Sequence, residues 1–122
     1  MKWKKEDGQA VVEFALLLPL LLLLIFGAMD FGWLFFNKIQ VNNASREGAR
    51  YAAIHWKEAD YVADTKNLVM ACAPGSVVTV DGSSSVEVTI SVKKDVNVLT
   101  GVTSTIIGDS VELTASCTMR KE

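Results

Sequence analysis

The stretch that decides the fold is Gly8-Gln9-Ala10-Val11-Val12-Glu13-Phe14, followed by an apolar run that continues to Phe36. Between Val11 and Phe36 only Glu13 and Asp30 are ionisable. A hydrocarbon core of about 30 Å requires about 20 apolar residues in a helix, so this segment is long enough to cross a membrane. A secretory signal peptide has a shorter apolar core, of about 7–15 residues, and a small-residue cleavage site that this run does not show. We therefore expect the segment to stay in the protein as a membrane helix.

The length and charge of the chain limit what else it contains. Its 122 residues leave room for one membrane helix and one small domain. The formal net charge of −2 argues against a nucleic-acid partner, because such a partner favours a basic patch.

Catalytic motifs are missing from the sequence. The single histidine, His55, has no serine or glycine-rich motif beside it, and no phosphate-binding glycine loop occurs. A zinc site built from His55, Cys72 and Cys117 would have too few ligands at the wrong spacing. We expect a protein that is not an enzyme and that has no cofactor and no metal.

The chain divides into four predicted parts. They are a leader at 1–8, a transmembrane helix at 9–36, a helical stalk at 37–57 and a small extracytoplasmic α+β domain at 58–122. Lysines beside a first membrane helix tend to stay cytoplasmic, and the leader carries Lys2, Lys4 and Lys5. This asymmetry predicts a single-pass protein with its N-terminus inside and its C-terminus outside.

Three residues are unusual within the membrane helix. A buried carboxylate is costly in lipid, so Glu13 either reaches the interface, is protonated or has a partner, such as the amine that a cut before Gln9 would create. Pro19 predicts a bend or local weakening, either an ordinary membrane-helix proline or a functional hinge. Asp30 lies on a polar stripe near the other end, which suits a protein partner or the outer interface better than lipid.

The helix is expected to continue as a stalk. Residues 39–56 contain no proline, so a helix from Gln9 to about Trp56 would measure on the order of 70 Å. Small residues recur every four positions and predict a close-packing seam: Ala44, Gly48 and Ala52. Arg46 and Arg50 lie one turn apart and either bind head groups or a partner's acids, or form a solvated polar face.

The remaining residues predict a helix and a sheet. A second amphipathic helix begins near Glu58 and is stopped by Pro74-Gly75. Alternating patterns predict three strands, at 77–80, 86–93 and 111–119. A loop at 95–109 carries apolar residues that either cap the core, touch the membrane surface or bind another subunit. The fold class is therefore α+β: a long N-terminal helix plus a second helix packed on a small three-stranded antiparallel sheet.

Cys72 and Cys117 are both expected to point into the small core. Cys72 lies at helical spacing with Tyr61, Thr65 and Leu68, and Cys117 alternates with the apolar residues of the last strand. We predict a disulfide between them if the domain faces an oxidising compartment. The alternative is a pair of buried free thiols.

The quoted stretch also carries a family resemblance. Glycine after a short basic leader, followed by glutamate at the fifth position of an apolar helix, resembles the prepilin-peptidase site of type IV pilins and pseudopilins. More narrowly, the chain is similar to the TadE-like family of tight-adherence (Tad/Flp) pilus-assembly proteins. The matching stretches are 10–20, 26–32 and 42–52, with weaker similarity at 118–122. Asp30 stands where the family usually has glutamate, so a carboxylate is retained.

This resemblance implies a type IV pilin-like fold and a role as a minor pilin or pseudopilin. It implies insertion in the bacterial cytoplasmic membrane, cleavage by prepilin peptidase between Gly8 and Gln9, and assembly into an extracellular adhesion pilus with other pilin-like subunits or copies of itself. Glu13, Phe14, Pro19 and Asp30 would act in assembly. Two alternatives remain: an uncleaved membrane-anchored binding module, or the main repeating subunit of the filament.

Overall fold

The computed structural model describes residues 5–122, with side-chain surroundings from residue 7 onward, so the predicted leader lysines Lys2 and Lys4 lie outside the described residues. In chain order the elements are α1 (Lys5–His55), α2 (Tyr61–Cys72), β1 (Val77–Asp81), β2 (Glu87–Asn97), α3 (Gly101–Ile107) and β3 (Ser110–Arg120). The predicted α+β class is confirmed: one long helix, a further helix and a three-stranded antiparallel sheet.

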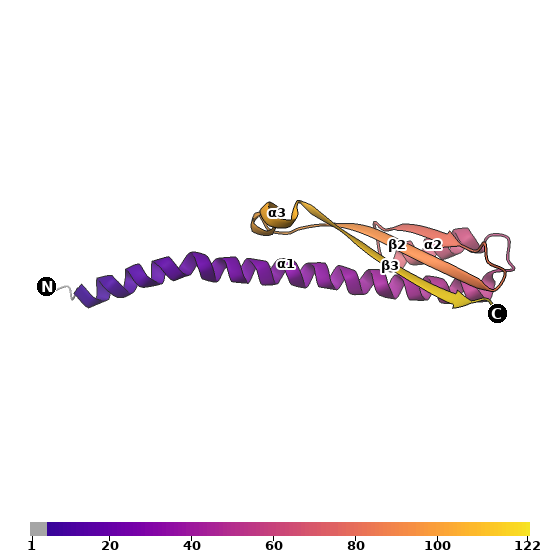
Figure 1. Cartoon of the computed structure of the whole chain (residues 1–122), viewed down its shortest axis with the longest axis horizontal. Helices are drawn as coiled ribbons and strands as arrows, with labels where there is room; N and C mark the ends of the chain where they lie inside the picture. The colour runs from indigo at the N-terminus through magenta and orange to yellow at the C-terminus, as the bar shows by residue number, and fades with distance from the viewer. Residues whose placement is uncertain (1–4) are drawn as a thin grey trace.

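The long helix α1 dominates the shape of the molecule (Figure 1). It has 51 residues and therefore measures about 76 Å at 1.5 Å per residue. Pro19 lies inside it without interrupting it, and the helix curves gently instead of breaking. After His55 the chain turns over residues 56–60, where the Glu58 amide donates to the His55 carbonyl at 2.9 Å. This turn lets α2 fold back along the outer half of α1.

The sheet is an open meander in the order β1-β2-β3. Val78 of β1 pairs with Val92 of β2, and Ile90 of β2 pairs with Cys117 of β3. Alternate residues of β2 are buried, as the two-residue period of a half-buried strand requires. The predicted loop at 95–109 is wrong in its extent, because β2 continues to Asn97 and the turn region contains the helix α3.

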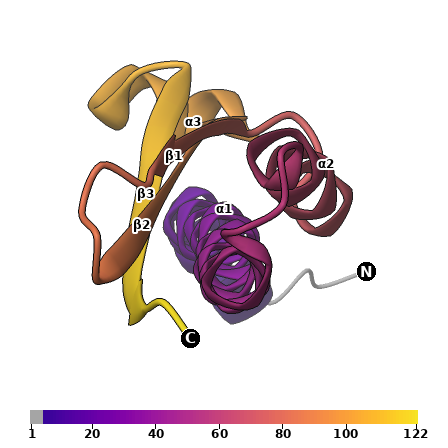
Figure 2. The same cartoon turned by 90° about the vertical axis from the view of Figure 1, so that its right-hand side faces the viewer.

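The core surrounds the outer half of α1 (Figure 2). The sheet covers one side of this half and α2 covers another, so the membrane-distal part of α1 is the centre of the domain. The fully buried side chains with the largest volumes come from all three parts: Val41 from α1, Val69 and Thr65 from α2, and Val88, Ile90 and Val92 from β2.

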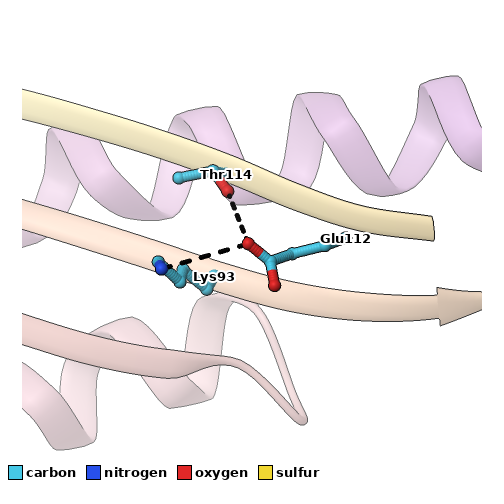
Figure 3. Close-up of polar contacts among 3 residues, drawn as sticks. All are labelled: Lys93, Glu112 and Thr114. Atoms are coloured by element: carbon cyan, nitrogen blue, oxygen red, sulfur yellow. Dashed lines mark hydrogen bonds and ion pairs between the residues drawn. The ribbon is translucent and has the colours of Figure 1, made fainter.

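Polar contacts fasten the sheet to the far end of α1. The Glu122 amide donates to the Ala53 carbonyl at 3.0 Å, and the Trp56 indole donates to the Glu122 carbonyl at 2.7 Å. On the outer face of the sheet, Lys93 and Glu112 approach to 4.0 Å beside Thr114 (Figure 3). Both charged side chains are more than half exposed, so this pair adds little stability.

Candidate functional site: the membrane helix and the Asp30 contact

The N-terminal half of α1 projects from the domain and is exposed along its whole apolar length. From Val11 to Ile25 the large apolar side chains are all exposed, with fractions such as 76% at Leu16 and 61% at Leu24. In the part of the chain from Asp7 onward, one helix is long and apolar enough to cross a membrane, and none of its most apolar window is buried. Lipid is the solvent that such a surface requires.

The residues of the predicted cleavage site lie inside this helix. Because α1 begins at Lys5, both Gly8 and Gln9 are helical, and both are exposed. Glu13 and Phe14 are also exposed, and among the side chains of residues 7–122 none forms an ion pair or hydrogen bond with Glu13. Cleavage and a pairing role for Glu13 stay predictions.

Asp30 is the best-defined polar site of the membrane helix. Its side chain is buried, with only 1% exposed, although its neighbours on α1 are largely in the open. The Leu99 and Thr100 amides donate to its Oδ1 at 3.1 and 3.0 Å, and the Thr100 hydroxyl donates to its Oδ2. The sequence predicted a partner or the outer interface for this carboxylate, and the structure supplies a partner from the same chain.

Those donors belong to the turn of the β2–β3 hairpin. The hairpin runs back along α1 towards the membrane half, which brings a segment 69–70 residues away in sequence onto Asp30. We call residues 98–109, which include α3, the hairpin tip. Sequence reasoning missed this contact; the signal available for it was an uncharged stretch, residues 96–108, with Thr100-Gly101 at its centre.

The predicted small-residue seam lies on the opposite half of α1 and is buried. Ala44 and Ala52 are fully buried, and Gly48 faces α2 and the sheet. A Cβ added at Gly48 would come within 2.4 Å of Val69 Cγ2 and 3.4 Å of Ile90 Cγ2. The missing side chain therefore allows α2 to approach α1 closely. Arg46 and Arg50 lie on the other face of the helix and are exposed.

The cysteines are not arranged as the sequence predicted. Cys72 is exposed and Cys117 is half-buried, and both are free. The expectation that Cys72 points into the core is wrong, because α2 buries the stripe of Thr65, Val69 and Ala73 instead. The disulfide between Cys72 and Cys117 is not formed in this structure and stays a prediction.

The fold and this surface define a protein with one candidate membrane-spanning helix that continues into an α+β domain. Residues 8–50 match the family model described as TadE-like protein. The predicted resemblance is thus confirmed over the exposed half of α1 and the first part of the buried seam, about a third of the chain. No curated protein and no solved structure matches the chain.

The match suggests a protein associated with a Tad pilus and with its other components. Together with the long apolar helix, the match supports a role in pilus assembly and anchoring of the protein in a membrane.

Proposed function

We infer that the chain is a minor pilin or pseudopilin-like structural subunit of a Tad/Flp-type pilus, without enzymatic activity of its own. It is inserted in the bacterial cytoplasmic membrane by α1, with the N-terminus inside and the α+β domain outside. Prepilin peptidase removes the leader after Gly8, and the mature chain joins other pilin-like subunits through its exposed helix.

One observation carries this proposal. The family match covers residues 8–50, which are the predicted cleavage site, the exposed apolar half of α1 and the start of the seam. Most of the matched residues, 8–36, therefore belong to the part of α1 that projects from the domain core. An apolar helical surface of this length suits lipid before assembly and neighbouring helices after it.

The predicted roles fit the exposed positions. Glu13 and Phe14 are open to neighbouring subunits, and a carboxylate in an apolar surface gains most from a cationic partner such as a mature N-terminal amine. Pro19 leaves one backbone carbonyl without its usual helical donor, which makes this turn easier to deform during assembly.

The mature N-terminus, measured together with its location, tests the proposal. Intact mass spectrometry of the protein from membranes and from sheared pili is expected to show a chain that starts at Gln9 and is present in the pilus fraction. A chain that keeps residues 1–8 and stays in the membrane would overturn the proposal in favour of an uncleaved membrane-anchored binding module.

A further inference from the structure

The hairpin tip lies beside the membrane half of α1 and away from the core. In Figure 1, α3 stands over the middle of α1, at the end of the hairpin that is farthest from the C-terminus. A groove between the two elements is lined from α1 by Leu23, Gly27, Phe31 and Leu34, and from the tip by Val102, Thr103, Ile106 and Ile107. Three of the α1 residues are apolar side chains of the candidate membrane span.

The level of this groove follows from the length of the apolar run. A hydrocarbon core takes about 20 helical residues, and the run extends from Val11 to Phe36. Any stretch of about 20 residues within this run, and so any possible membrane-spanning segment, contains both Leu23 and Gly27. Leu23 lies at least 7 residues, or about 10 Å, inside the domain-side edge of each such stretch. The tip therefore reaches the depth of the acyl chains.

The composition of the tip suits that depth. Residues 96–108 contain no ionisable side chain. Large apolar side chains of the tip are exposed although they lie near α1: 80% of the residue at Ile106, 55% at Ile107 and 55% at Leu99. In water this would be an unfavourable surface, since apolar area is stabilised by removal from water.

Charged side chains of both elements lie on the domain side of the tip. Lys94 of β2 donates to Gln40 Oε1 at 3.0 Å, and Lys38 of α1 donates to the Thr114 carbonyl of β3. The α1 residues of these contacts, Lys38 and Gln40, follow Phe36, where the apolar run of α1 ends. Two segments that are distant in sequence thus place lysines together on the domain side of the apolar run, as expected near a membrane surface.

Several polar groups of the tip are bound within the protein. The Leu99 and Thr100 amides are bound by Asp30, and the Ser104 and Thr105 hydroxyls donate to the Gly101 carbonyl at 2.9 Å. Lipid offers no hydrogen bonds, so irregular backbone is tolerated at this depth only where the protein binds its polar groups. Asp30 supplies that binding where the strand ends and α3 begins.

We propose that the hairpin tip inserts into the leaflet on the domain side of the membrane, with the side chains of Leu99, Ile106 and Ile107 among the lipid acyl chains. The protein is then held in the membrane by two elements, and Asp30 joins them. This inference rests on the membrane span in the proposed function and is independent of the pilus assignment. Asp109 closes the tip, where the Val98 amide donates to the Asp109 carbonyl at 3.1 Å.

Depth-dependent fluorescence quenching tests the insertion. The full chain carrying Cys72→Ser and Cys117→Ser is reconstituted in phosphatidylcholine–phosphatidylglycerol vesicles, with one cysteine labelled by an environment-sensitive fluorophore. The label is placed at Ile106 in the tip, at Leu22 in α1, or at Ser85 in the exposed turn between β1 and β2. We expect blue-shifted emission at Ile106, and quenching by acyl-chain spin-labelled lipid similar to that at Leu22 and more than about twofold stronger than at Ser85.

The outcomes separate the competing explanations. Lipid quenching at Leu22 but not at Ile106, with access of aqueous iodide to Ile106, would overturn the insertion and leave the membrane span intact. Blue-shifted emission at Ile106 without lipid quenching would mean that a second copy covers the tip, which also overturns the proposal. An absence of lipid quenching at Leu22 itself would show that the membrane span is wrong, and the insertion with it.

Discussion

Asp30 offers the sharpest single perturbation of this structure. Replacement by leucine keeps the approximate volume of the side chain and removes all acceptors for the Leu99 and Thr100 amides and for the Thr100 hydroxyl. A buried donor left without an acceptor costs about 1–3 kcal/mol. The loss of the acceptor for both amides is therefore expected to weaken the docking of the hairpin tip by about 2–6 kcal/mol. The loss of the hydroxyl contact is offset by the absence of a buried carboxylate.

Asparagine is the matched control at this position. Its Oδ1 accepts from both amides as the carboxylate does, and its Nδ2 donates to the Thr100 hydroxyl, which then acts as acceptor. We expect Asp30→Asn to keep most of the docking free energy, so the contrast between Leu and Asn isolates the hydrogen bonds from the charge.

Native-state hydrogen exchange in nanodiscs measures the effect. A loss of about 2–6 kcal/mol corresponds to about 30- to 20,000-fold faster exchange of the Leu99 and Thr100 amides in Asp30→Leu. Amides of the buried seam near Ala49 are expected to exchange as in the unchanged protein, because the core does not include the tip. Equal exchange of the tip amides in the leucine and asparagine variants, or no change in either, would refute the hydrogen-bond explanation.

Four further predictions address other parts of the chain. Gly8→Ala is expected to abolish leader removal without loss of membrane insertion, as read by intact mass and membrane fractionation, because nothing lies within 4 Å of the added Cβ. Glu13→Gln is expected to reduce pilus number on cells while leaving cleavage intact, since the helix loses the charge on which the proposed pairing depends. Gly48→Ala is expected to lower the free energy of unfolding by up to about 2 kcal/mol, as measured in denaturant titrations. Overpacking costs about 1–3 kcal/mol, and the higher helix propensity of alanine offsets about 1 kcal/mol of this cost. The Ser83 hydroxyl and amide, helped by the positive charge of Lys121, lower the pKa of Asp81 below its ordinary value of 3.8. The ionised carboxylate therefore stabilises this turn at neutral pH, and the stabilisation is lost as the pH falls through the lowered pKa. NMR titration of the Ser83 amide measures this loss.

Each of these predictions has a control and a contradicting result. Gly27→Ala adds a Cβ to the same helix with equal free space, so a similar block of cleavage there would exclude a specific site at Gly8. Glu47→Gln changes an exposed charge outside the membrane segment, and an equal drop in pilus number would remove the special role of Glu13. Gly32→Ala is the control for Gly48→Ala. No atom lies within 4 Å of the added Cβ, so the free energy of unfolding is expected to stay the same or to rise.

Two further controls address the packing at Gly48 and the pKa of Asp81. Val69→Ala removes the methyl that the new Cβ of Gly48→Ala meets, so the two changes together should cost less than their sum; strict additivity would contradict the packing argument. Ser83→Ala should move the pKa of Asp81 back towards 3.8, and an unchanged titration would exclude the hydroxyl as the main cause.

The membrane helix and the sheet could be predicted from the sequence because their patterns are local. An apolar run from Val11 to Phe36 and alternating strands need no tertiary information. The end of β2 could not be predicted so easily. Its alternation passes through Lys94, which occupies an inward position and extends its amine to Gln40, so a charged residue conceals a strand that continues to Asn97.

The candidate site, too, could be predicted from the sequence only in part. Asp30 was identified by its charge in an apolar helix, but its partners are 69–70 residues away and carry ordinary threonine and leucine side chains. The error at Cys72 has a geometric cause. Leu68 and Val69 are consecutive on α2 and lie about 100° apart around the helix. The close approach permitted by Gly48 buries Val69 and leaves Cys72, one turn after Leu68, exposed.

A single helix forms both the exposed membrane half and the centre of the domain core, with no linker between them. An axial pull or a twist applied to the helix beyond Pro19, for example at Leu24, is therefore transmitted through continuous backbone hydrogen bonds to Val41 and Ala52. The domain has no freedom to swivel while the membrane half is held. In this protein, the position and rotation of the helix in its surroundings directly set the direction in which the outer domain faces.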